Sequence, residues 1–249
     1  MAQRERNINS NTIQTTFQFM ITRILLAVFT LMAFTSSLSA QGRQSTDLEC
    51  TAVAMQTLEI EPLFFRVGKE YQEFTYKTSK RGPTFYLPAS SEEFELYEQV
   101  KPEEGGEVLY QIVGQCLVPK GTKRVLFLVA NSSRKSVEAS RILMRGLSDS
   151  FNDFPPGSMC FGNFTGEDLL VKIGDKISEL KGRAFTVVRL NAPKEGGYIP
   201  VAYGDSNGNT LHFTKLYSQP RARKMVIITK PSNERRPLDF AFISQNISE

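Results

Sequence analysis

The chain has 249 residues, of which 41% are apolar and 22% are charged, and this composition excludes a fibrous repeat or a disordered chain. Its formal net charge is +4, and the first 40 residues (three Arg against one Glu) account for +2, so the rest carries only +2 and lacks the charge excess of nucleic-acid-binding domains. The chain contains no Trp and a single His, His212, which leaves room for at most one site of histidine-dependent catalysis or metal binding.

The N-terminal part predicts export. An apolar run at 24–34 follows Arg23 and precedes small and polar residues, which is the order found in a secretory signal peptide. The run is too short for a membrane-spanning helix, which needs about 20 apolar residues. We expect a signal peptide at 20–40 with cleavage after Ala40, or alternatively after Ser39. The mature protein is then periplasmic or extracellular.

The start of translation has two candidates. Residues 1–19 are polar and resemble neither a domain nor the short positive segment that begins a signal peptide. We therefore expect translation to start at Met20 rather than Met1, which makes 1–19 an extension outside the real precursor. A lipid anchor is not expected, because Cys50 is the first cysteine and lacks a small-residue context. No later apolar run reaches membrane length, so no transmembrane segment is expected after signal cleavage.

The first half of the mature chain predicts short strands. Residues 41–57 are an N-terminal segment, and 58–130 alternate apolar and polar residues between turn signals, as the strands of a first β-sandwich half would. The run at 125–130 is continuously apolar, which is typical of a strand buried on both faces. A helix is an alternative at 90–100. The predicted strands are 58–60, 63–67, 74–76, 84–87, 94–97, 108–113, 116–118 and 125–130.

A polar stretch at 131–140 predicts the boundary between the two halves, because it has no apolar anchor. Beyond it, 141–249 is the expected second β-sandwich half, in which 141–147 suits a helix or a strand. Its predicted strands are 158–164, 169–173, 185–190, 198–203, 211–217, 225–229 and 240–243. The expected fold is all-β, a two-sheet antiparallel β-sandwich or two packed immunoglobulin-like modules. No close sequence repeat is visible.

Four turn and strand segments stand out in the second half, namely Phe-Pro-Pro-Gly-Ser at 154–158, Gly-Asn-Phe-Thr at 162–165, Leu-Val-Lys-Ile-Gly-Asp at 170–175 and Lys-Met-Val-Ile-Ile at 224–228. With them the chain resembles a group of secreted β-sandwich proteins from environmental Gram-negative bacteria, which have no assigned activity. The resemblance implies a fold and secretion. The resemblance transfers no functional residue, because turn and strand residues determine the fold and do not perform chemistry.

Three cysteines, Cys50, Cys116 and Cys160, lie in the mature part. The number is odd, so at least one thiol stays free or pairs between chains. Cys116 and Cys160 lie in apolar runs, which favours buried free thiols, and a disulfide from Cys50 to one of the others is the alternative. A nucleophilic cysteine is disfavoured, since a partner histidine is nearly lacking.

Residues 205–209 and His212 are candidate site residues in the second half. Residues 205–209 place oxygen-bearing side chains at alternate positions, as a Ca²⁺ loop begins, but Thr210 and Leu216 stand where such a loop has Gly and Glu. An Asn-Gly hairpin turn explains the same residues. His212 alternates with Leu211 and Phe213, which predicts that it faces the polar side of its strand. We expect no metal site and no cofactor.

A basic patch is the remaining candidate site, formed if two neighbouring strands pair. It would suit an anionic partner such as lipopolysaccharide or an acidic polysaccharide, whereas a solvated hairpin end is the simpler interpretation. Its residues are Arg221, Arg223, Lys224, Arg235 and Arg236.

The sequence favours an exported non-catalytic binding or scaffolding protein of the cell envelope over an enzyme. Its expected partner is an unknown envelope protein or a polysaccharide, and not a nucleic acid. One alternative is an exported hydrolase that uses a carboxylate pair drawn from residues such as Glu103, Glu104 or Asp205. A second alternative is a subunit of an envelope or secretion assembly.

Overall fold

The computed structural model describes residues 47–100, 107–132, 140–190, 195–231 and 235–246. Within them every regular element is a β-strand, and the sixteen strands form four sheets of four. The all-β sandwich expected from the sequence is therefore confirmed. Within the described ranges, no helix has the length and apolar character needed to cross a membrane.

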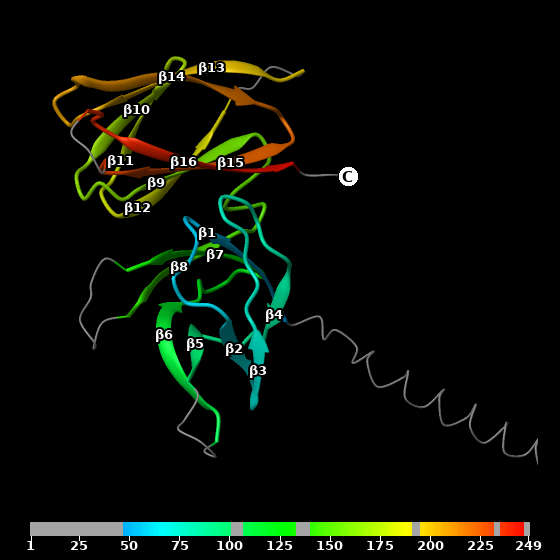
Figure 1. Ribbon diagram of the computed structural model, residues 1–249. Helices are drawn as coiled ribbons and strands as arrows, with labels where there is room; N and C mark the ends of the chain where they lie inside the picture. The colour runs from blue at the N-terminus through cyan, green and yellow to red at the C-terminus, as the bar shows by residue number, and fades with distance from the viewer. Residues whose placement is uncertain (1–46, 101–106, 133–139, 191–194, 232–234, 247–249) are drawn as a thin grey trace, which may run out of the picture. The chain divides into compact units, whose positions relative to one another are not determined.

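The first eight strands form the first module (Figure 1). Its two sheets have the orders β4-β1-β7-β8 and β3-β2-β5-β6. Between them lies an apolar core with a cluster of phenylalanines, in which the rings of Phe94 and Phe127 are 4.2 Å apart. The strands are β1 (Leu48–Ala54), β2 (Leu63–Val67), β3 (Glu70–Glu73), β4 (Phe85–Leu87), β5 (Glu93–Val100), β6 (Leu109–Leu117), β7 (Arg124–Asn131) and β8 (Ile142–Ser148).

The next eight strands form the second module around a separate core (Figure 1). Its sheets have the orders β12-β9-β15-β16 and β11-β10-β13-β14. The strands are β9 (Ser158–Asn163), β10 (Leu169–Ile173), β11 (Lys176–Leu180), β12 (Ala184–Arg189), β13 (Gly197–Gly204), β14 (Thr210–Ser218), β15 (Ala222–Thr229) and β16 (Asp239–Asn246).

The two modules have the same topology. Counted from the first strand of each, one sheet has the order fourth, first, seventh, eighth and the other the order third, second, fifth, sixth. The hairpins β2–β3 and β10–β11 also share their turn, since Gly68 and Gly174 have φ of 63° and 57° and begin a two-residue connection. The second module is thus a structural repeat of the first, in a chain without a close sequence repeat.

Each module has one parallel strand pair in otherwise antiparallel sheets. The first and seventh strands run parallel, β1 with β7 and β9 with β15. A parallel pair needs a long crossover, and here the five intervening strands supply it. This pairing buries β7 on both faces, as expected from its continuous apolar run. Val125, Phe127 and Val129 face the core of the first module, while Leu126 and Leu128 lie on the opposite face.

The boundary between the modules differs from the expected one. Residues 131–140 do not separate two halves, because β7 and β8 flank them and pair antiparallel up to Asn131 and Ile142. The connection between modules is 149–157, after β8. The segment 41–57 contains a core strand, β1, and the candidate helices at 90–100 and 141–147 are strands β5 and β8. The expected extension and signal peptide, 1–19 and 20–40, lie outside the described residues.

A third apolar cluster joins the modules. It combines side chains from the outer face of β4-β1-β7-β8 with side chains from the outer face of β12-β9-β15-β16. The modules therefore meet through equivalent sheets, and residues 46–249 form one compact unit. The buried members of this cluster are Val53, Leu126, Leu128, Phe154, Cys160, Met225, Ile227 and Ile243.

Candidate functional site

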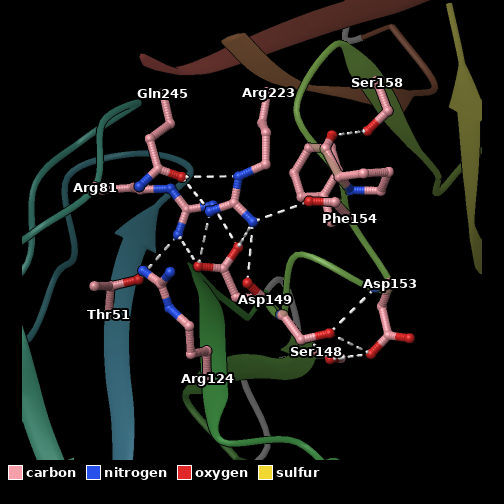
Figure 2. A network of polar contacts seen from close by, with 12 residues as sticks. Thr51, Arg81, Arg124, Ser148, Asp149, Asp153, Phe154, Ser158, Arg223 and Gln245 are labelled. Carbon is pink, nitrogen blue, oxygen red and sulfur yellow. Dashed lines mark hydrogen bonds and ion pairs between the residues drawn. The ribbon is translucent and has the colours of Figure 1, made fainter. Parts of the chain in front are cut away.

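A buried carboxylate lies where the modules meet. Asp149 is the first residue after β8, and its side chain is 3% exposed. Arg81, from the loop between β3 and β4, donates to both of its oxygens, from Nη1 to Oδ2 at 2.6 Å and from Nη2 to Oδ1 at 2.7 Å (Figure 2). This bidentate geometry is the strong form of an arginine–carboxylate contact.

Arg223 reaches the same carboxylate from the second module. It lies on β15, its side chain is 0% exposed, and its Nη1 is 3.1 Å from Asp149 Oδ1. The guanidinium also donates to the backbone oxygens of Asp149 at 3.0 Å and Phe154 at 3.1 Å, and to the side-chain oxygen of Gln245 on β16 (Figure 2). Burial lowers the pKa of Arg223, and the nearby Asp149 opposes that shift. One carboxylate thus links arginines of both modules.

Phe151 extends this network toward solvent. The guanidinium carbons of Arg124 and Arg223 each lie 4.9 Å from the centre of its ring. Arg124 also pairs with Glu49, with 3.0 Å between Nη2 and Oε1. The contacts connect β1, β7, β15 and the 149–157 segment. Because both oxygens of Asp149 already accept hydrogen bonds, this arrangement suits a structural link rather than acid–base chemistry.

The outer face of β3-β2-β5-β6 carries an aromatic cluster. The rings of Tyr71 and Tyr110 stack with 3.7 Å between their centres, and Phe64 and Tyr97 contact them edge-on. The cluster lies opposite the core, since Leu63 faces inward on the same strand as Phe64. Burial and the hydrogen bond to Glu95 raise the pKa of Tyr97 to about 12.

The equivalent outer face of the second module also exposes apolar side chains. Strand register places Ile177, Lys172, Ala202 and Phe213 in one row across β11-β10-β13-β14. Phe213 is 60% exposed. Large apolar groups concentrated on a solvent-facing sheet indicate a contact surface.

The open side of the second module forms a groove between β14 and the β15–β16 hairpin. It has a volume of ≈ 340 Å³. We call it the β14–β16 groove. Side chains of three strands line it, namely Thr214, Leu216, Lys224, Val226, Phe242 and Ser244, together with Lys215, Tyr217, Met225 and Ile243.

The basic patch expected from the sequence does not form as one surface. Arg223 belongs to the buried junction. The hairpin pairs from Ala222↔Asn246 to Thr229↔Asp239, so Arg221 and Lys224 lie at one end and the exposed Arg235 and Arg236 follow the other. Seven residues of strand separate the two ends by about 23 Å.

The 205–209 segment is a hairpin turn, as the simpler interpretation predicts. The Oδ1 of Asp205 accepts hydrogen bonds from the backbone nitrogens of Asn207 at 2.9 Å and Asn209 at 2.8 Å. The hydrogen bonds from Asn209 are the main cause of a lowered pKa for Asp205. Across the described ranges, no group of three or more His, Cys, Asp or Glu side chains is arranged to hold a metal ion. Glu103 and Glu104 lie outside those ranges.

His212 faces the interior, and the expectation of a polar face is wrong. A bulge between β13 and β14 pairs Tyr203 with His212 but Gly204 with Thr210, which leaves Leu211 as an extra residue. The extra residue changes which side of the sheet the following residues of β14 face. The His212 ring therefore lies 6.1 Å from Tyr203 and 4.8 Å from Phe240, both at the core of the second module.

The three thiols are free, as favoured by their apolar surroundings, and the alternative Cys50 disulfide is absent. Cys50 and Cys160 are buried, and burial raises the pKa of each to about 12. Burial raises the pKa of the partly buried Cys116 to about 11.

Sequence reasoning missed the junction and the aromatic cluster. Asp149 and Arg81 lie in polar loop segments that carry no motif, and their partners are 68 or more residues away in sequence. The strand-like runs at 94–97 and 108–113 are the only sequence signal for Tyr97 and Tyr110. A comparison with protein-family models and with curated proteins finds no match.

Proposed function

We propose that this protein is an exported, non-catalytic binding or scaffolding protein of the cell envelope. Its two modules, which we regard as immunoglobulin-like, present their outer sheet faces to an envelope protein or polysaccharide. Two coupled modules of equal topology suit this role, because they hold two similar surfaces in one unit.

The junction is the observation that carries the proposal. Asp149 accepts hydrogen bonds from arginines of both modules, and an apolar cluster joins the same two modules. Contacts between domains that only share a linker are usually more polar and allow relative motion. A buried ion-pair network set in an apolar contact instead supports a fixed arrangement of the modules, which a scaffold requires.

The exposed faces support binding. The aromatic cluster around Tyr71 and Tyr110 and the apolar row through Phe213 lie on the sheets that do not take part in the junction. Tyrosine and phenylalanine provide large contact areas with few rotatable bonds, and they are enriched at protein interfaces.

The buried thiols are compatible with export. An oxidising compartment favours disulfides, and a free thiol persists there when its thiolate is rare and inaccessible. Cys50 and Cys160 meet both conditions, since each is buried and has a pKa of about 12. The predicted signal peptide at 20–40 would direct the chain to export from the cytoplasm.

Site-specific photo-cross-linking in the native host tests the proposal. A photoreactive phenylalanine analogue is placed at Ile112 on β6 or at Phe213 on β14, both exposed on outer faces, and at Asn207 in the hairpin turn as the control. We expect the mature protein in the envelope fraction and discrete adducts from at least one face position but not from Asn207. Identical diffuse labelling at all three positions, or retention of the protein in the cytoplasm, would refute the proposal.

A further inference from the structure

The β14–β16 groove is an unfilled part of the sandwich interior. On β16, Phe240 faces the core, so the alternate residues Phe242 and Ser244 face the same side. Phe242 pairs with Val226, which is fully buried, yet Phe242 is 49% exposed. An inward-facing phenylalanine is therefore left uncovered where the sheet ends.

The first module closes the equivalent side. Its strands β6 and β8 approach closely because each has a glycine at the contact. A Cβ at Gly114 would lie 2.8 Å from the backbone oxygen of Ile142, and one at Gly146 would lie 2.7 Å from that of Leu117. Strands β14 and β16 contain no glycine, so their side chains keep the two edges apart.

Both borders of the groove are sheet edges. β14 and β16 are each the last strand of their sheet, so among the described strands each has one side without a neighbour. Such an edge accepts an added strand through main-chain hydrogen bonds, and pockets beside it select alternate side chains.

The charges beside the groove indicate the chemistry of the added strand. Lys215 and Lys224 line the groove, and no carboxylate is among its lining residues in the described part of the chain. Lys224 points inward from β15, and its Nζ donates to the backbone oxygen of Tyr217. Burial lowers the pKa of Lys224, so a carboxylate partner would stabilise its charged form. A second copy of the chain would bring the same positive charges and is disfavoured.

We propose that the β14–β16 groove binds an extended segment of a partner protein with alternating apolar and acidic residues. The segment pairs with β16, covers Phe242 with its apolar side chains and places a carboxylate at Lys224. This inference rests on the proposed binding function and names its site and the chemistry of its partner.

Selection of displayed peptides against the purified mature protein tests the inference. Random peptides of eight residues match the length of β16. We expect enrichment of sequences that alternate apolar residues with Asp or Glu, and protection of β16 amides from hydrogen exchange when such a peptide is bound. Lys224→Met should weaken binding about tenfold or more, since it removes a charge-assisted hydrogen bond.

Two control variants accompany this test. Lys224→Arg keeps the charge and should retain binding, and Lys120→Met, exposed in the first module, should leave it unchanged. The inference is overturned if no acidic pattern is enriched, if Lys224→Met binds as well as the parent, or if protection appears elsewhere. Self-association of Lys224→Met with no loss of peptide binding would show that Lys224 only prevents edge-to-edge pairing between copies of the chain. Face-specific cross-links at Ile112 or Phe213 would in each of these cases leave the proposed function standing.

Discussion

Removing the carboxylate at the junction is the most direct test of how the modules are held. Asp149→Ala deletes the acceptor shared by Arg81 and Arg223. The guanidinium of Arg223 is 0% exposed and cannot turn to water without opening the contact. It therefore remains buried with only neutral acceptors, from the backbone and from Gln245.

Deleting one partner of a buried ion pair costs about 3–5 kcal/mol of unfolding free energy. For a unit of roughly 200 residues this lowers the melting temperature by about 6–20 °C. Asp149→Leu combined with Arg223→Met should be more stable than Asp149→Leu alone, because the double variant leaves no unpaired guanidinium from the second module. Arg81 is closer to solvent and can be hydrated in both.

Urea unfolding of the mature protein measures this effect. Tyrosine fluorescence and circular dichroism serve as probes, since the chain has no Trp. The matched control is Glu92→Ala, which breaks an exposed pair with Lys120 and should hardly move the midpoint. We also expect the single transition of the parent to split into two in Asp149→Ala, as the modules uncouple.

A loss below about 1 kcal/mol, the range of surface ion pairs, would refute this reasoning. It would mean that the contact between the modules is open to water or that the apolar cluster alone holds it. A large loss without restoration in the double variant would show instead that the shape of the junction, and not its charge, decides its stability.

Three further predictions follow from the described contacts. Gly114→Ala or Gly146→Ala should lower the free energy of unfolding by about 1–3 kcal/mol in urea titrations, because the new Cβ meets a backbone oxygen, and a change under about 0.5 kcal/mol would contradict the close approach. A thiol reagent at about pH 8 should label none of the three cysteines in the folded protein within minutes and all three in urea, whereas rapid native labelling of Cys116 would show that it is accessible. The lowered pKa of Asp205 means that its stabilising effect is present above about pH 4 and is lost as the pH falls through the folded-state pKa. Asp205→Ala should therefore flatten the acid limb of the urea midpoint, and an unchanged acid limb would argue against the turn.

The pattern of apolar residues and turn residues along the chain predicted much of the fold. Alternation of apolar residues indicated the strands, and the continuous run at 125–130 indicated a strand with two buried faces, which β7 has. Gly-containing turns such as the one at 205–209 could be identified because few residue types adopt the positive φ that these turns require. The same pattern failed at His212, since a single bulge residue reverses every alternation that follows it.

By itself the sequence determined that this chain forms many short strands and where most of them turn, and it favoured free thiols over a disulfide. Only the tertiary structure decided which strands pair, that β1 runs parallel to β7 and β9 to β15, and that the module boundary falls at 149–157. It also decided that Asp149 joins Arg81 to Arg223 across 68 and 74 residues of chain. The physical reason is how far apart along the chain the interacting residues lie. Strand periodicity and turn chemistry depend on neighbours along the chain, whereas pairing and charge burial depend on residues that only the completed fold brings together.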